Sequence, residues 1–435
     1  MAGRARGLAR RGLGAYVRTY RNATPNARRY LLIGALQNVG AGLLGTAFAL
    51  YITAAGMSTT VVGDVEGALA LASGVVCLLL PPLVAVVGYR WLLVSAGVAF
   101  ALSRLGQTIG VGSTAIIALG LAYGMGDGIQ RSIGVAFLSE NGPAGSERTM
   151  LFTVDFFVRI AASLVGAVIG GLLPTLLSQT MPEVQALRLT IAVAGAMFLA
   201  SSLPALGLQE TPRRIEHAWS SYWRSIRGFR SWRRLASLAI PEAIIALGAG
   251  LVMPFVPLLL NVRLGATVAQ IGFIQGMTSL VMALATLLTP LLARKLGLMG
   301  TVVITQLASL PFLLVIPLAW SLPVVVLAMW VRTALMNMAW PVYNQVAVEN
   351  VPPKDRPLVL GWVAVAWSAA WLVGTAAGGR LATQSYTVGY FITAALYGVG
   401  AVVAWLLLRH IRLAPEAVPE LAAEGLVLEA AEPRA

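Results

Sequence analysis

Long apolar stretches, separated by short breaks of glycine, proline or charged residues, recur along almost the whole chain. An apolar helix of about 18 or more residues is long enough to cross a bilayer core about 30 Å thick. The pattern predicts twelve membrane-spanning helices, over residues 30–54, 61–86, 91–110, 113–138, 149–177, 187–208, 236–260, 268–293, 299–319, 322–347, 357–382 and 386–408. We therefore expect an all-α polytopic membrane protein.

The polar segments outside the spans divide the chain into parts. The longest internal polar segment, 209–235, separates an N-terminal six-helix bundle, 30–208, from a C-terminal six-helix bundle, 236–408. A basic segment, 1–29, precedes the first bundle, and an acidic tail, 409–435, follows the second. We expect that tail to be disordered.

Composition excludes several function classes. Hydrophobic residues make up 58% of the chain and charged residues only 11%, against roughly 25% charged residues in a soluble domain. The single cysteine, Cys77, lies in a span, and the two histidines, His217 and His410, lie outside the spans. The sequence therefore predicts no disulfide, no metal site and no cofactor. The net charge of +14 is not gathered on one folded face, so we expect no nucleic-acid partner.

The basic residues are distributed unequally between the two sides of the predicted bundle. Of the 31 Lys and Arg residues, 24 fall in segments on the side of both termini, and only Arg188 and Arg263 fall on the opposite side. Cytoplasmic segments carry the excess of Lys and Arg in membrane proteins. The sequence therefore predicts an integral protein of the cell membrane with both termini in the cytoplasm.

Short motifs of the first bundle return in the second at a nearly constant offset. The segment Gly40–Leu43 recurs as Gly248–Leu251 at an offset of 208, and Val62–Gly67 is echoed by Ile271–Gly276 at an offset of 209. We interpret the chain as a tandem duplication of a six-helix unit. Because six is an even number, the halves enter the membrane in parallel, related by an axis along its normal, with a central cavity between them.

These features resemble the major facilitator superfamily of secondary transporters over roughly residues 28–410. In the loop after the second helix that family carries G-x-L-x-D-R-x-G-R-R, and the corresponding stretch here is Pro81–Arg90. Leu83, Gly88 and Arg90 fit the motif, whereas Ala85 and Val86 replace its acid and first arginine. The resemblance implies the superfamily's fold and transport by alternating access.

A finer resemblance bears on the substrate and direction. The stretch Phe137–Asn141, followed by Glu147 and Arg148, is similar to a generic bacterial solute and efflux subgroup. It implies proton-coupled efflux (antiport) of a small organic solute by a monomer, with protons and membrane lipids as further partners. Import of a sugar or organic anion, lipid export, and a receptor or scaffold without transport remain open.

The motifs of other classes are absent from the sequence. It contains no GxxxxGK[ST] phosphate loop, no HExxH, no GxSxG and no histidine in any span. We therefore do not expect an enzyme or direct use of ATP.

Ionisable side chains within spans need partners or a wet cavity, because each costs about 2.5 to 3.5 kcal/mol to insert. Asp127 with Arg131, and Asp155 with Arg159, share an i,i+4 spacing that puts each pair on one helix face. From the helical rise we expect a ladder across the two helices, Arg131 with Asp155 and Asp127 with Arg159. These ion pairs either stabilise the first half permanently, or one of them breaks during the transport cycle to bind substrate or a proton.

The other buried charges are candidates for substrate binding and coupling. Arg332 has no carboxylate at helical spacing and suits an anionic or polar substrate group, unless it pairs with a carboxylate on another helix, such as Glu242, or with backbone carbonyls. Glu242 is a candidate for proton coupling, because a carboxyl group removed from water favours its protonated form, or it reaches interfacial water. Further candidates for lining the cavity are polar or aromatic residues of the tenth and first helices, namely Asn337, Trp340, Asn344, Gln37 and Asn38.

Two further patterns favour structural roles. The glycine runs that include Gly166 and Gly170 in the fifth helix, with counterparts in the eleventh, allow close helix packing between the halves. The segment Arg213–Arg234 carries Trp219 and Trp223 among its arginines and predicts a basic amphipathic helix on the inner membrane surface.

Overall fold

The computed structural model describes residues 23–109, 112–141, 146–210, 217–349, 351–352 and 355–409. The first half consists of helices α2 (Pro25–Ala54), α3 (Thr59–Val87), α4 (Tyr89–Gln107), α5 (Ser113–Asn141), α6 (Ser146–Leu177) and α7 (Glu183–Leu206). The acidic tail, the N-terminal segment before residue 23 and His410 lie outside the described residues. These six helices agree with the first six predicted spans, with ends that differ by a few residues.

The second half repeats this arrangement after a short linker helix, α8 (Ala218–Arg227). Its first span, α9 (Trp232–Val252), continues through three short turns, η1 (Met253–Phe255), α10 (Val256–Leu258) and η2 (Leu259–Arg263). The remaining helices are α11 (Val268–Leu318), α12 (Leu322–Glu349), α13 (Arg356–Ala382) and α14 (Tyr386–Leu408). Within the described residues, nine helices or helix segments are long and apolar enough to cross a membrane.

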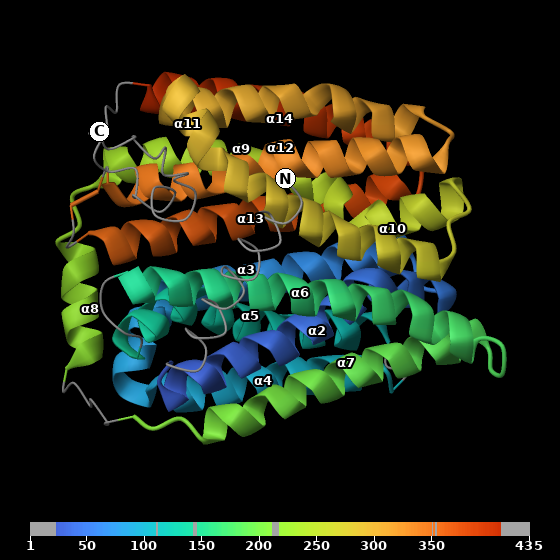
Figure 1. Ribbon diagram of the computed structural model, residues 1–435, viewed down its shortest axis with the longest axis horizontal. Helices are drawn as coiled ribbons and strands as arrows, with labels where there is room; N and C mark the ends of the chain where they lie inside the picture. Colours follow the sequence, from blue (N-terminus) through green and yellow to red (C-terminus); the bar gives the residue numbers. More distant parts are fainter. Residues whose placement is uncertain are drawn as a thin grey trace, which may run out of the picture.

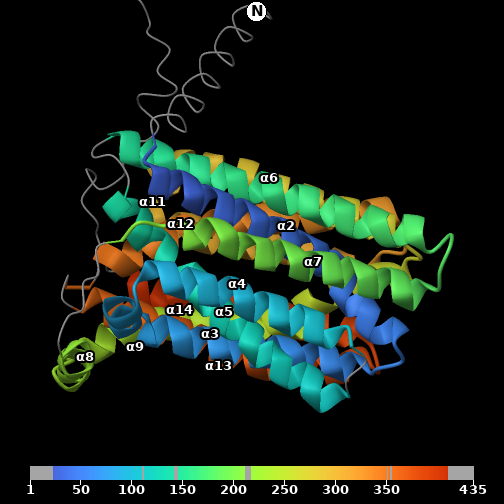
Figure 2. The same cartoon turned by 90° about the horizontal axis from the view of Figure 1, so that it is seen from below.

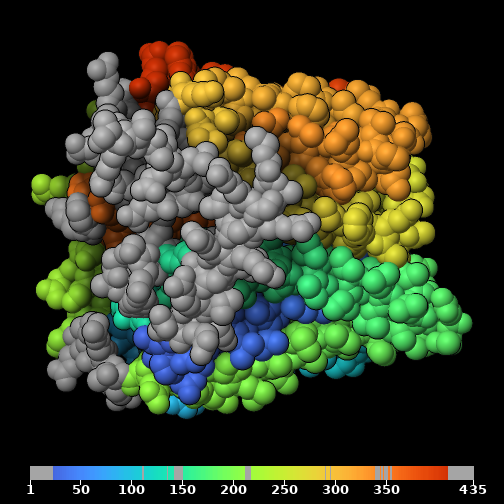
Figure 3. Space-filling model, in the orientation of Figure 1, coloured from blue at the N-terminus to red at the C-terminus, as the bar shows by residue number. Residues whose placement is uncertain are grey.

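All the spans run along the long axis of the molecule. In Figure 1 the first six helices, blue to green, lie below the last six, yellow to red, and α8 crosses the ends of the spans at the left. Figure 2 shows the same parallel spans from a second direction, with α8 again at one end. The surface in Figure 3 divides in the same way between the two halves. We call the end at which α2 begins and α14 ends the terminal end, and the opposite end the distal end.

Two glycines in a left-handed backbone conformation set the same turn in each half. Gly88, with φ of 81°, separates α3 from α4, and Gly297, with φ of 71°, interrupts α11 between two predicted spans. Only glycine adopts such angles without strain. The two positions are 209 residues apart, which is the offset of the sequence repeat. The structure therefore confirms the duplicated six-helix unit at its tightest turn.

The packing inside each half follows the same repeat. A Cβ added to Gly166 on α6 would lie 2.1 Å from the carbonyl oxygen of Val39 on α2. In the second half, a Cβ on Gly374 of α13 would lie 2.3 Å from the carbonyl oxygen of Leu247 on α9. Both pairs are related by an offset of 208, so part of the glycine runs serves packing within the halves rather than between them.

The two halves meet along two lines of equally close contact. On α3, a Cβ on Gly63 would lie 2.2 Å from the carbonyl oxygen of Thr375 on α13. On α11, a Cβ on Gly272 would lie 2.5 Å from the carbonyl oxygen of Ala167 on α6. These contacts are again related by the repeat. Small residues that let helix backbones approach closely are typical of helix association in membranes. Burial of apolar surface contributes little to that association, because the lipid is itself apolar.

A first prediction concerns this interface between the halves. The variant Gly272→Ala places a methyl group against the backbone of α6, which forces the helices apart at a cost of about 1–3 kcal/mol. The matched control is Gly45→Ala on α2, since a Cβ there meets nothing within 4 Å. We expect Gly272→Ala to unfold at a lower temperature in detergent and Gly45→Ala to unfold at an equal or higher one, because alanine favours helices. Equal melting temperatures for the two variants would contradict the interface.

Candidate functional site

The second half encloses a cavity of about 170 Å³ between α9, α11, α12, α13 and α14. Every residue that lines it belongs to the second half, namely Glu242, Ile245, Ala249, Met253, Gln306, Arg332, Met336, Asn337, Tyr343, Trp367 and Tyr397. The sequence predicted a cavity between the halves, whereas this one lies inside one half. Its lining includes polar and charged side chains as well as apolar ones.

Glu242 lies on α9, directly after Pro241, and is only 5% exposed. Among the described residues it has no hydrogen-bond or ion-pair partner. The nearby hydroxyl of Tyr343 donates its hydrogen bond elsewhere, to the backbone carbonyl of Leu238. An ionised carboxylate in such a place costs several kcal/mol unless a cation or donor compensates it. Glu242 is therefore a buried carboxyl group that lines the cavity.

Arg332 lies on α12 and is 7% exposed. Its Nη2 donates to the hydroxyl of Tyr397 at 2.9 Å, and its Nη1 contacts the Met253 sulfur at 3.3 Å. Its Nε has no partner. All described partners of this guanidinium are thus neutral, and the charge is not balanced by Glu242, although both side chains line the same cavity.

The other predicted residues of α12 divide into two groups. Asn337 lines the cavity, and its side-chain amide donates to the carbonyl of Thr333 on its own helix at 2.8 Å. Trp340 and Asn344 lie outside the residues whose side chains the structure describes.

Gln37 and Asn38 of α2 are not among the residues that line the cavity. Gln37 is 3% exposed and donates to the Ser201 hydroxyl on α7 at 3.3 Å. Asn38 donates to the carbonyl of Gly34 on its own helix at 2.8 Å. Their contacts in this structure are those of polar groups that pack the first half.

Sequence reasoning missed Gln306 and Tyr397 as cavity residues. Gln306 is 5% exposed and its Oε1 has no partner. As an amide inside an apolar span it could have been singled out. Tyr397 gives no such signal, because only the approach of α14 to α12 identifies its hydroxyl as the acceptor for Arg332.

The first charged pair of the first half is partly open. Arg131 Nε contacts Asp127 Oδ2 at 2.5 Å, within α5, and the Ser73 hydroxyl of α3 donates to the same oxygen at 2.8 Å. The Arg131 side chain is 67% exposed, whereas that of Asp127 is 19% exposed. The carboxylate is therefore held from two sides, while the guanidinium remains accessible.

The second pair is enclosed. Arg159 Nε contacts Asp155 Oδ2 at 2.8 Å within α6, with side chains 22% and 15% exposed. The guanidinium also packs against Gly34 of α2 and lies 5.3 Å from the ring centroid of Tyr30. In this structure the guanidinium is therefore held by contacts within the first half.

The predicted ladder between the two helices is wrong. In the part of the chain that the structure describes, each aspartate pairs with the arginine of its own helix. The i,i+4 spacing brings those atoms together without help from a second helix. By contrast, α5 and α6 touch at only a few positions.

A further buried charge of the first half is Arg104 of α4, which is 2% exposed. Its guanidinium carbon lies 4.5 Å from the Phe48 ring centroid and 4.0 Å from that of Tyr123, and its Nη1 donates to Gln107 at 2.8 Å. Glu66 of α3, which sequence reasoning passed over, is close enough to interact with it electrostatically. This cluster adds a further carboxyl group to the polar interior.

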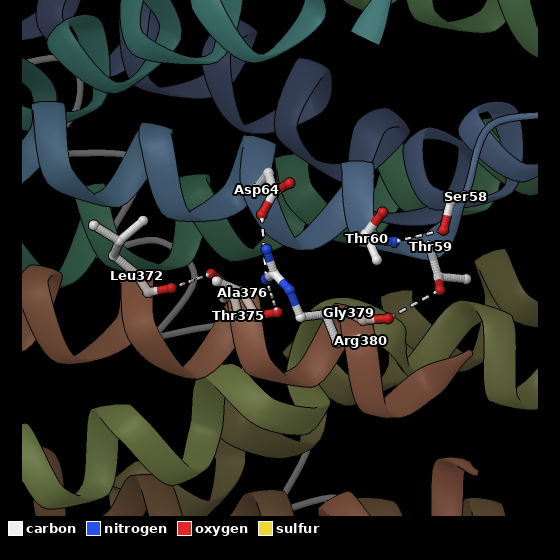
Figure 4. Close-up of polar contacts among 9 residues, drawn as sticks. All are labelled: Ser58, Thr59, Thr60, Asp64, Leu372, Thr375, Ala376, Gly379 and Arg380. Atoms are coloured by element: carbon white, nitrogen blue, oxygen red, sulfur yellow. Dashed lines mark hydrogen bonds and ion pairs between the residues drawn. The ribbon is translucent and has the colours of Figure 1, made fainter. Parts of the chain in front are cut away.

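At the distal end, α3 and α13 are joined by polar contacts as well as by glycine packing (Figure 4). The Thr59 hydroxyl donates to the carbonyl of Gly379 at 3.1 Å. Arg380 reaches Asp64 at 3.9 Å, with side chains 65% and 33% exposed. Its Nη1 also donates to the carbonyl of Ala376 at 2.6 Å. The two halves are therefore in contact at this end.

Comparisons with known proteins bear on this arrangement. Residues 238–430 match the model of the Major Facilitator Superfamily. The nucleoside transporter NupG has a similar structure, with a TM-score of 0.69, 14% identity, and coverage of 90% of this chain and 100% of that one. The fold is therefore that of the major facilitator superfamily.

Two other solved structures support the same fold. A bacterial homologue of the human lysosomal transporter Spinster, inward-facing and unoccupied, matches with a TM-score of 0.69 and 15% identity over 89% of this chain and 98% of that one. A D-xylose–proton symporter matches with a TM-score of 0.65 and 16% identity over 90% and 98%. No curated protein matches the chain. The major facilitator fold is thus established. Sequence identities this low do not indicate which substrate the protein binds.

A second prediction concerns the contact between Arg332 and Tyr397. The variant Tyr397→Phe removes the hydroxyl acceptor and leaves a buried guanidinium donor unpaired, which costs about 1–3 kcal/mol. The control is Tyr390→Phe, on the same helix and equally buried at 2% exposed, because the Tyr390 hydroxyl has no hydrogen-bond partner among the described residues. We expect a lower melting temperature in detergent only for Tyr397→Phe. An equal decrease for both variants would rule out the hydrogen bond as the cause.

A third prediction distinguishes the two charged pairs. The variant Arg159→Gln leaves the enclosed Asp155 without its cation, whereas Arg131→Gln leaves Asp127 with its bond from Ser73. Removing one partner of a buried pair costs about 3–5 kcal/mol, against about 0–1 kcal/mol for an exposed pair. Thermal unfolding should therefore show the larger loss for Arg159→Gln. The opposite order would mean that Arg131, not Arg159, holds the first half together.

Proposed function

We propose that this protein is a secondary transporter that binds a small organic solute with an anionic or polar group in the cavity of the second half and couples its movement to protons. The observation that carries the proposal is the presence of two buried charged side chains, Glu242 and Arg332, in one cavity without an ion pair between them in the part of the chain that the structure describes. We take the terminal end to be cytoplasmic, because the excess of Lys and Arg lies on that side.

Arg332 supplies the affinity for an anion. Its described partners are a hydroxyl and a thioether, and neither neutralises its charge. A carboxylate or similar group of the solute would provide both a counter-charge and acceptors for the guanidinium donors. The cavity volume of about 170 Å³ is similar to that of a cavity of roughly 150 Å³ that holds benzene. It therefore suits a solute, or the head of a solute, about the size of one ring.

Glu242 supplies the proton site. The Glu242 carboxyl group has no partner among the described residues. It is neutral when protonated, and when ionised it has no counter-charge or hydrogen-bond donor in contact with it. Once ionised, it would compete with the solute for the neighbouring charge of Arg332. Protonation of Glu242 would therefore favour binding of an anion, so that proton and solute move together. One of the similar structures is that of a proton symporter, which supports proton coupling here.

A second candidate is proton-driven export, which the resemblance of the stretch Phe137–Asn141 to efflux members favours. In an exchange of that kind proton and solute compete for the same site. The two candidates therefore predict opposite effects of pH on binding. Acidic buffer strengthens binding in symport and weakens it in antiport.

The fourth prediction tests this function by thermal unfolding of the detergent-purified protein with a panel of drugs, sugars, amino acids and organic anions. A ligand that binds only the folded state raises the melting temperature. We expect an organic anion to stabilise the wild type, and more strongly in acidic than in alkaline buffer. The variant Arg332→Gln should show no increase of the melting temperature with the ligand. The variant Glu242→Gln should show the increase in both acidic and alkaline buffer, since glutamine resembles the protonated carboxyl group.

The control is Tyr390→Phe, which should respond as the wild type does. A ligand that stabilises the wild type and Arg332→Gln equally would contradict the cavity as the site. A shift that weakens in acidic buffer would replace symport with antiport. Flux of the identified ligand into proteoliposomes, driven by a pH gradient of either sign, then gives the direction.

A further inference from the structure

Between the two halves, α8 and the turn that leads into α9 expose tryptophan and arginine side chains together. Trp219, Trp223 and Trp232 are 38%, 49% and 55% exposed. Arg227 and Arg230 are exposed beside them. We call the exposed residues Trp219, Trp223, Arg224, Arg227, Arg230 and Trp232 the linker surface. No aspartate or glutamate occurs between residues 217 and 241, so the surface is purely basic and aromatic.

The opposite side of the linker is fixed to both halves. Tyr222 is 8% exposed, and its hydroxyl donates to the carbonyl of Leu78 on α3 at 2.5 Å. Burial raises the pKa of Tyr222, so the hydroxyl stays protonated and can donate. The Ser231 hydroxyl donates to Asp355, at the start of α13, also at 2.5 Å. The linker surface therefore faces outward from a segment that is held in place.

With the bilayer core taken to begin at Thr59, at the distal end of α3, the linker surface lies at the level where the core ends. Helix α3 has 29 residues and is about 43 Å long, whereas the bilayer core is about 30 Å thick. Counted from Thr59 at the distal end, about 30 Å of helix reaches Leu78, the residue that Tyr222 contacts. Figure 1 shows α8 lying crosswise to the spans at this end. Its axis is thus parallel to the membrane surface.

We propose that the linker surface binds anionic phospholipid headgroups of the leaflet at the terminal end. Tryptophan is enriched at membrane interfaces, where its ring is apolar and its N–H remains wet. Arginine forms paired hydrogen bonds with phosphate oxygens. A soluble anion would engage the arginines and leave the three tryptophans in water. Because the linker is bonded to α3 and to the start of α13, a bound lipid stabilises the observed contact between the halves. This inference does not depend on the proposed substrate site.

The test measures thermal unfolding of the full-length protein in detergent micelles that contain either phosphatidylglycerol or phosphatidylcholine. We expect phosphatidylglycerol to raise the melting temperature of the wild type and phosphatidylcholine to leave it unchanged. The double variant Arg227→Gln/Arg230→Gln should lose at least half of the shift, and so should Trp219→Ala/Trp223→Ala. The control Arg188→Gln/Arg263→Gln changes the net charge equally at the other end and should keep the shift.

Several outcomes would overturn the proposal. One is an equal shift from inorganic phosphate or from polyglutamate, which would indicate a site for soluble anions or acidic chains. Another is an unchanged phosphatidylglycerol shift in both linker variants. If the glutamine variant fails to fold, Arg227→Lys/Arg230→Lys keeps the charge but loses the paired hydrogen bonds of arginine. It should show a reduced shift, and a full shift would contradict specific binding of headgroups.

Discussion

The approach of backbone to backbone at Gly63 and Gly272 is the constraint on which the rest of the structure depends. Helices in lipid gain little from burying apolar surface, so close packing must supply most of their association. The duplicated unit provides the same contact twice, α3 with α13 and α6 with α11. The α13 helix of the first contact also lines the cavity. On α13, Trp367 lines the cavity while the next residue, Ser368, lies against Gly74 of the first half. A shift of the halves against each other therefore moves a cavity wall directly.

The two halves have diverged in how they treat buried charge. At the repeat offset of 208, Gly34 corresponds to Glu242 and Arg159 corresponds to Trp367. In the first half the space beside Gly34 is filled by the guanidinium of Arg159, and Asp155, one turn away on the same helix, neutralises that charge. At the corresponding position of the second half is Glu242, whose carboxyl group has no partner among the described residues. A paired charge stabilises one arrangement, whereas an unpaired charge remains free to respond to a ligand or a proton.

The sequence predicted those features that depend on local spacing. The spans follow from apolar length, the turns at Gly88 and Gly297 from the repeat, and each Asp–Arg pair from an i,i+4 spacing. The predicted ladder between α5 and α6 is wrong because the rise per residue gives only the position of a side chain along the helix axis. It does not give the rotation of the helix about that axis, which determines the neighbour that the side chain faces. The acceptor for Arg332 could not be predicted for the same reason. Tyr397 lies on α14, and the packing of α14 against α9 and α11 determines where its hydroxyl points.

The polar contact at the distal end is weak compared with the packing beside it. Arg380 and Asp64 are 3.9 Å apart and largely exposed, and such pairs contribute about 0–1 kcal/mol. The backbone contact at Gly63 next to it is close but forms no network of buried bonds that would have to be broken. The halves can therefore separate at this end without leaving buried charges unpaired. A ligand biases such an equilibrium only by binding one state better than the other. In the proposed function Arg332 and Glu242 would provide that difference, since they line the same cavity as Trp367 of α13.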